Sequence, residues 1–213
     1  MLRSSSSIGA PVLWVLCTLA ASLATSACGT FSVMRPADNL KAGQVEISGG
    51  LTVNSLPDAN PVLQANVGVL DWLELGAQYE TYSAEGWLRF APLSTDDNGL
   101  ALALSLGAGG LNTIGWSSDE HSLDDSWTPT LMGGATLGRR FADWFEPYIG
   151  VRLFYLASSE IALTTVKGGM RFTPARWSWG AFWLGLEGGA TFYDGLFAVG
   201  EGTAALGFIF GSM

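Results

Sequence analysis

The sequence predicts an all-β protein whose strands close into one antiparallel, up-and-down β-barrel. The chain is apolar, with a mean hydropathy of +0.30 and only 14% charged residues. No stretch after residue 27 contains the roughly 20 consecutive apolar residues that a membrane helix needs. Glycine, a poor helix former, accounts for 28 of the 213 residues. An apolar chain without long apolar runs must distribute its hydrophobic residues by alternation, which is the pattern of a transmembrane β-barrel.

Segments with a period of two follow one another from residue 43 to the end of the chain. In the first segment, Val45 and Ile47 alternate with Glu46, and a β-strand sends such sets to opposite faces. We expect about ten strands, or eight or twelve if the region 83–98 is divided differently. The expected strands are 43–54, 61–70, 73–82, 85–91, 99–110, 128–140, 144–156, 160–172, 178–192 and 197–210.

Charged residues well inside one predicted strand share a face, opposite the bulky apolar set. This holds for Glu74 with Glu80, and for Lys167 with Arg171. Arg139 beside Arg140 is the exception and falls at a strand end. An Arg or Lys that faces lipid at the midplane costs about 2–4 kcal/mol, so the charges are expected inside the barrel. The expected interior network consists of Glu46, Glu74, Glu80, Arg89, Arg140, Glu146, Arg152, Lys167, Arg171, Glu187 and Glu201. A lipid-anchored soluble β-sandwich or lipocalin-like barrel is the alternative, with the apolar face buried in the centre.

Connection lengths and aromatic residues predict the two ends of the barrel. Short turns are typical of the periplasmic end and longer loops of the outer end, and the longest connection, 111–127, falls on the outer side. Aromatic residues are enriched at both membrane interfaces. The expected interface residues are Trp72, Trp144 and Trp179 on the periplasmic side and Tyr155 on the outer side, with Trp177, Trp127 and Phe192 as further members.

The first 27 residues have the organisation of a secretory signal. Arg3 precedes an apolar run from Ile8 to Ala24, and small residues lead to Cys28. This end resembles the lipobox of bacterial lipoproteins, although Thr25 stands where leucine is usual. The resemblance implies that Cys28 is lipidated; ordinary cleavage with a free thiol, and an uncleaved anchor, are the alternatives. Residues 28–42 have no period and are interpreted as a tether to the barrel of residues 43–213.

The alternating pattern of residues 43–213 resembles the bacterial outer-membrane β-barrel proteins at the level of architecture. The last strand alternates Leu206, Phe208 and Phe210, as in that class, but Gly-Ser-Met follows the final aromatic residue. The resemblance implies location in the bacterial outer membrane. It also implies contact with outer-membrane lipids and lipopolysaccharide, and recognition by the barrel-assembly machinery.

No motif in the sequence dictates a reaction. Small barrels have interiors filled by side chains, which favours a structural or surface-interaction role; a narrow channel or small-ligand barrel is the alternative. The loop segment 119–125 holds His121 beside several acids, but a hydrolytic triad needs groups from separate segments, so a lipid-modifying enzyme is disfavoured. The calcium-loop spacing is absent, and we expect no cofactor or metal. The net charge of −9 argues against a nucleic-acid partner.

Overall fold

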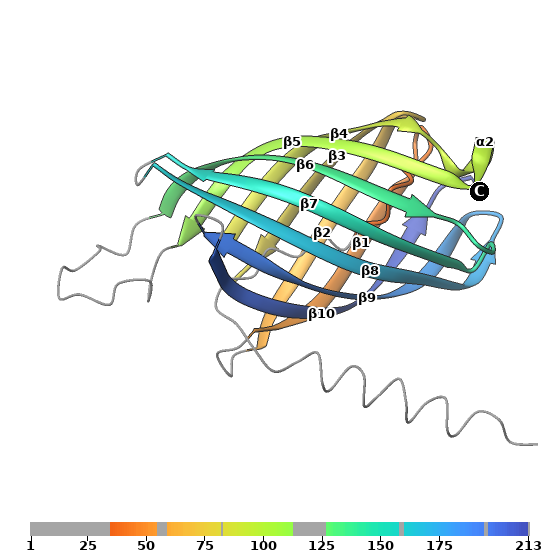
Figure 1. Ribbon diagram of the computed structural model, residues 1–213. Helices are drawn as coiled ribbons and strands as arrows, with labels where there is room; N and C mark the ends of the chain where they lie inside the picture. Colours follow the sequence, from red (N-terminus) through yellow and green to blue (C-terminus); the bar gives the residue numbers. More distant parts are fainter. Residues whose placement is uncertain are drawn as a thin grey trace, which may run out of the picture.

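The protein is a closed ten-strand barrel in a computed structural model that describes residues 35–54, 59–81, 83–112, 127–157, 160–193 and 196–212 (Figure 1). The predicted signal of residues 1–27, Cys28 and the segment around His121 lie outside these residues. The strands are β1 (Val45–Asn54), β2 (Ala59–Leu70), β3 (Leu73–Glu80), β4 (Ser83–Leu93), β5 (Leu100–Asn112), β6 (Trp127–Arg139), β7 (Phe145–Leu156), β8 (Ile161–Trp177), β9 (Gly180–Tyr193) and β10 (Leu196–Phe210), with a short helix α2 (Thr95–Asn98) between β4 and β5.

Every strand pairs antiparallel with its neighbours in the chain, and β1 pairs with β10 to close the barrel. The predicted fold class is therefore confirmed. The longest strand, β8, continues beyond the predicted end at residue 172 to Trp177. Its pairing with β9 shifts register between Phe172 and Ala175, around Pro174. Proline lacks an N–H for the ladder, and an irregularity accommodates it, so the strand resumes where the sequence predicts a turn.

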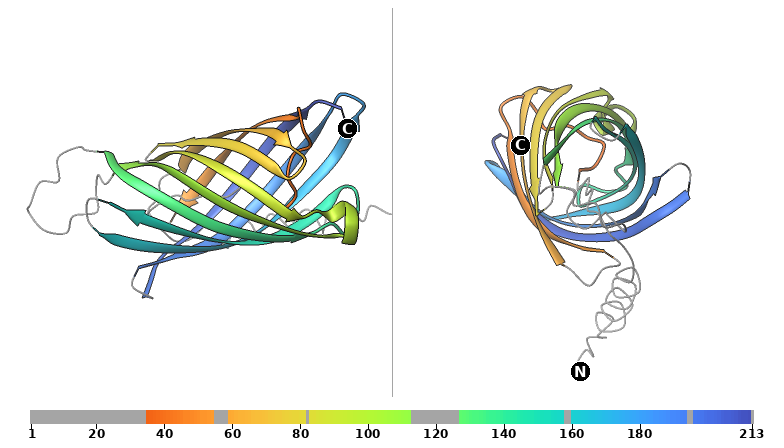
Figure 2. Two further views of the ribbon diagram at one scale, coloured as in Figure 1. Left: turned by 90° about the horizontal axis from the view of Figure 1, so that it is seen from above. Right: turned by 90° about the vertical axis from the view of Figure 1, so that its left-hand side faces the viewer.

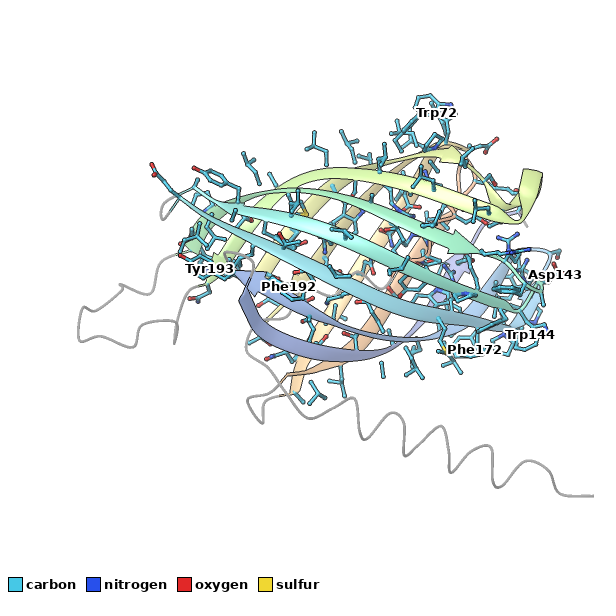
Figure 3. All side chains as sticks on the ribbon, in the orientation of Figure 1. Trp72, Asp143, Trp144, Phe172, Phe192 and Tyr193 are labelled. Carbon is cyan, nitrogen blue, oxygen red and sulfur yellow. The ribbon has the colours of Figure 1, made fainter. Side chains whose placement is uncertain are left out.

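The bulky apolar side chains point away from the barrel (Figure 3). Leu51, Leu75 and Leu153 are 55%, 46% and 56% exposed, although each lies within a strand. The alternative of a soluble barrel with these leucines packed in the centre is therefore wrong. A surface with this many exposed apolar side chains is stable in hydrocarbon and not in water, and a closed barrel leaves no strand edge unpaired there.

The two ends of the barrel differ. The C-terminal residues and α2 lie at one end, which also holds the short connections after β2, β6 and β8 (Figure 1). The longest connection, between β5 and β6, is at the other end. By the rule that outer loops are longer, the end with α2 is the periplasmic end, called here the inner end. Among the described residues, no helix is both long enough and apolar enough to cross a membrane.

Candidate functional site: the barrel interior

A network of buried ion pairs crosses the barrel near its inner end, and Arg35 is at its centre. The Arg35 guanidinium donates to Glu46 at 2.8 Å and also bonds Glu74. Arg171, on β8, reaches the same Glu46 carboxylate at 2.9 Å. Arg89 lies 3.9 Å from Glu74 and donates to the backbone carbonyl of Pro36. These pairs join β1, β3, β4 and β8 across the lumen, so this level of the barrel is occupied by side chains.

Arg35 belongs to a segment that enters the barrel mouth and is not part of the wall. Residues 35–40 cross the inner end, where the Leu40 N–H donates to Glu74 at 3.0 Å. Asp38 accepts from Thr95 at the start of α2 and from Arg140 at the rim. The right-hand view of Figure 2 looks into the barrel and shows the start of the described chain, in orange, inside the ring of strands. This part of the chain, which the sequence predicts to be a tether, is an inner-end plug in the structure.

A second buried group, centred on Lys167, lies in the middle of the barrel. Its ammonium is 2.7 Å from Glu201 and 3.5 Å from Glu187. Tyr148 donates a hydrogen bond to Glu187 at 3.0 Å. Residues Lys167, Gly189 and Glu201 are neighbours on β8, β9 and β10. Because Gly189 has no side chain, the Lys167 stem can pass over β9 to reach Glu201; a Cβ at Gly189 would lie 2.6 Å from the Lys167 Cγ.

Inward aromatic rings fill the space around these charges. Trp87, Tyr148 and Trp183 each lie over a glycine directly opposite on the next strand. The pairs are Trp87 with Gly76, Tyr148 with Gly169 and Trp183 with Gly207. A Cβ on any of these glycines would come within 2.6 Å of the ring. The glycines of the wall thus make room for large rings in a narrow lumen, and the rings in turn carry cations.

Two of the cations are held on those rings. The Arg171 guanidinium lies 4.7 Å from the centre of the Trp183 ring. The Arg152 guanidinium lies 5.8 Å from the centre of the Trp87 ring and pairs with Glu85 at 2.8 Å. Cation–π contacts contribute about 2 kcal/mol when desolvated, so each arginine has both a ring and a carboxylate in contact.

Apolar side chains line the interior of β5 to β8 towards the outer end. Met132, Phe154 and Leu163 are neighbours across β6, β7 and β8. With Leu111 and Leu156 they form a buried cluster, against which Ile161 packs. The sequence pattern does not predict this cluster. Phe154 lies two residues after Arg152 and therefore points inward with it. An alternating pattern is usually interpreted with the apolar residues on the lipid side, so it does not reveal inward positions that are apolar.

Ten of the eleven predicted interior residues have buried side chains, and Arg140 is the exception. Arg140 follows the last residue of β6 and lies at the inner mouth, where it pairs with Asp38 and Asp96. Glu80 is fully buried, and Gln78 donates to it at 2.6 Å. Two buried charges were missed. Glu85 lies on the inward face of β4 with Arg89, and the spacing of four residues between them could have indicated that Glu85 is buried. Arg35 lies outside any strand, so no periodic pattern indicates its burial.

The predicted interface aromatics lie at the ends of the strands with exposed rings. Trp72 and Trp144 are at the inner end, and Figure 3 shows them with Asp143 and Phe172 there. The Trp177 and Trp179 rings stack at 5.4 Å beside the turn between β8 and β9. Tyr155 lies at the outer end of β7 with its ring exposed. The two ends of the barrel therefore carry aromatic rings where the interfaces of a bilayer would lie.

Two cavities of different size border the interior side chains. One void of about 10 Å³ lies beside Tyr148 and Trp183, which is room for one water molecule. A larger cavity of about 380 Å³ lies at the inner mouth, between the plug and the ends of β7 and β8. In the part of the chain that the structure describes, no three His, Cys, Asp or Glu side chains gather to hold a metal ion.

A closed antiparallel barrel with an apolar exterior and a charged interior defines the class of bacterial outer-membrane β-barrel proteins. The chain matches no protein-family model and no curated protein sequence. Solved structures similar to it include the outer-membrane protein OmpT of Vibrio cholerae, folded in vitro, and a mutant of it without loop L8. Both are 10% identical to this chain, with TM-scores of 0.28 and 0.29; the alignments cover 78% of this chain and 95% and 97% of theirs. The membrane assignment therefore rests on the barrel's own geometry.

Proposed function

We propose that this protein is a non-conducting, non-enzymatic barrel with a structural or surface-interaction role in the outer membrane. The observation that carries the proposal is the filling of the lumen by side chains near its inner end. The Arg35 plug and its ion pairs with Glu46 and Glu74 lie across the lumen there. Water and ions would have to displace these ion pairs to cross, and buried ion pairs are costly to separate.

The conductance of the protein in a planar lipid bilayer tests this proposal. We expect no steady current from the wild-type protein, because the buried ion pairs of Arg35 and Arg171 occupy the lumen near its inner end. An open porin inserted in the same bilayer serves as the positive control. Stable current steps from the wild-type protein would contradict the proposal and favour the alternative of a narrow channel.

The same proposal includes a lipid anchor at Cys28. It is supported by the small residues before Cys28 and by the short chain between Cys28 and the plug at Arg35. Seven residues span at most about 25 Å, so an anchor in the periplasmic leaflet could hold the plug close to the barrel mouth. Cells fed radioactive palmitate should label the wild-type protein and not the Cys28→Ser variant. Equal labelling of both, or none of either, would argue against lipidation.

A further inference from the structure

The cavity at the inner mouth is open to the periplasm and lined mainly by charged side chains. It measures about 380 Å³, within the range of small-ligand sites, and lies between the plug, β7 and the extended end of β8. Its walls include Arg35, Asp38, Arg140, Glu146, Arg171 and Arg176. The cavity can bind a ligand through those charges that are not already paired with an opposite charge of the protein.

Most of the cations of the cavity are already paired. Arg35 bonds Glu46 and Glu74, and Arg171 reaches the same Glu46 at 2.9 Å. Arg140 pairs with Asp38 at 2.5 Å, and with Asp96 at 3.3 Å. Arg140 and Lys41 are balanced by Asp38 and Asp96. The cations Arg35, Arg89 and Arg171 outnumber the carboxylates Glu46 and Glu74 by one charge. These paired groups form a polar wall of the cavity.

Glu146 differs from the other buried acids. Its side chain lines the cavity, it is only 8% exposed, and its Oε1 atom has no hydrogen-bond partner among the described residues. No cation of the described chain lies within ion-pair distance of it, although Arg171 is its direct neighbour on β8 and is engaged by Glu46. A buried carboxylate without a partner is costly, and a bound cationic group would remove that cost.

The opposite charge lies on the same cavity. Arg176 follows the irregularity near Pro174, on the part of β8 that extends beyond the predicted strand end. Its side chain donates to the backbone carbonyl of Asp143 and has no carboxylate within ion-pair distance among the described residues. The guanidinium is exposed and retains donors for an anionic group.

From this arrangement we infer that the inner-mouth cavity binds a small zwitterion from the periplasm. The ammonium of the ligand contacts Glu146, and its carboxylate or phosphate contacts Arg176. Amino acids and short peptides carry these groups, and so does the headgroup of an ethanolamine phospholipid. The site is separate from the plugged lumen, so its occupancy does not require conduction.

Equilibrium dialysis of the detergent-solubilised protein against radiolabelled glycylglycine tests the inference. We expect saturable binding to one site, with empty micelles as the blank. N-acetylglycylglycine lacks the ammonium and glycylglycinamide lacks the carboxylate, so both should compete about tenfold less well than glycylglycine itself. Glycerophosphoethanolamine distinguishes the source: stronger competition than glycylglycine assigns a lipid headgroup, and weaker competition assigns a peptide. Absence of saturable binding would overturn the inference.

Three variants connect the binding to the named groups. Glu146→Gln and Arg176→Gln should each weaken glycylglycine binding by about tenfold, because each removes one charged contact. Arg139→Gln is the matched control, since Arg139 lies over the Phe141 ring outside the cavity and its loss should leave binding unchanged. Every variant is first checked for the shifted gel migration of an unheated barrel. Folded Glu146→Gln protein that binds as well as wild type would overturn the assignment.

Discussion

Replacing Lys167 with methionine should lower the free energy of unfolding by about 3–5 kcal/mol, the loss expected when one partner of a buried ion pair is removed. Lys167 is 1% exposed and is the cation that contacts both Glu187 and Glu201. Methionine retains the length of the stem over Gly189 but leaves two carboxylates facing each other in the lumen. Urea unfolding in lipid vesicles, followed by tryptophan fluorescence, measures the change.

The control for this variant removes all three charges. The triple variant Lys167→Met, Glu187→Gln and Glu201→Gln has no unpaired buried charge, so it should recover most of the stability that the single variant loses. A single variant within about 1 kcal/mol of wild type would mean that water reaches these carboxylates freely, which contradicts a filled interior.

Replacing Leu88 with arginine should destabilise the barrel by about 2–4 kcal/mol, the cost of an arginine that faces lipid at the bilayer midplane. Leu88 lies at the middle of β4, is exposed, and has Leu75 and Leu106 as neighbours on the adjoining strands. The charge would have no polar group nearby in the hydrocarbon. The same urea unfolding measurement gives the effect.

Leu93 provides the matched control on the same strand. It is also an exposed leucine, but it is the last residue of β4 and lies next to α2 at the inner end. Leu93→Arg should therefore cost only about 0–1 kcal/mol, as at the bilayer interface. Equal costs at Leu88 and Leu93 would mean that the two positions have the same surroundings, which no membrane-spanning orientation of β4 allows.

The strand pattern was predictable because a period of two is a local property of the sequence. Glu74 shares a face with Glu80, and Lys167 with Arg171, because the residue numbers in each pair differ by an even number. In all four residues this face is the inward one. The end of β8 was not predictable to the same degree. Pro174 argues for a turn, and only the pairing with β9 shows that the strand continues past it.

The plug and the outer cluster could not be predicted, for a different reason. Arg35 is buried through contacts with Glu46 and Glu74, which lie 11 and 39 residues away in the chain. No local pattern encodes such a contact. Likewise Phe154 and Leu163 are inward and apolar, and alternation alone assigns apolar residues to the lipid face. The occupation of the lumen by the plug is therefore a property of the tertiary structure, and the proposed function depends on it.

The direction of the outer leucines is the claim on which the membrane assignment depends. Single cysteines at Leu51, Leu75, Leu104 and Leu153, in a chain whose two native cysteines are replaced by serine, can carry nitroxide labels in lipid bilayers. Electron paramagnetic resonance then compares collisions with oxygen, which concentrates in lipid, and with a water-soluble nickel chelate. We predict that oxygen dominates at all four positions. Labels that are immobilised and screened from both reagents would place these leucines in a central core and contradict the account.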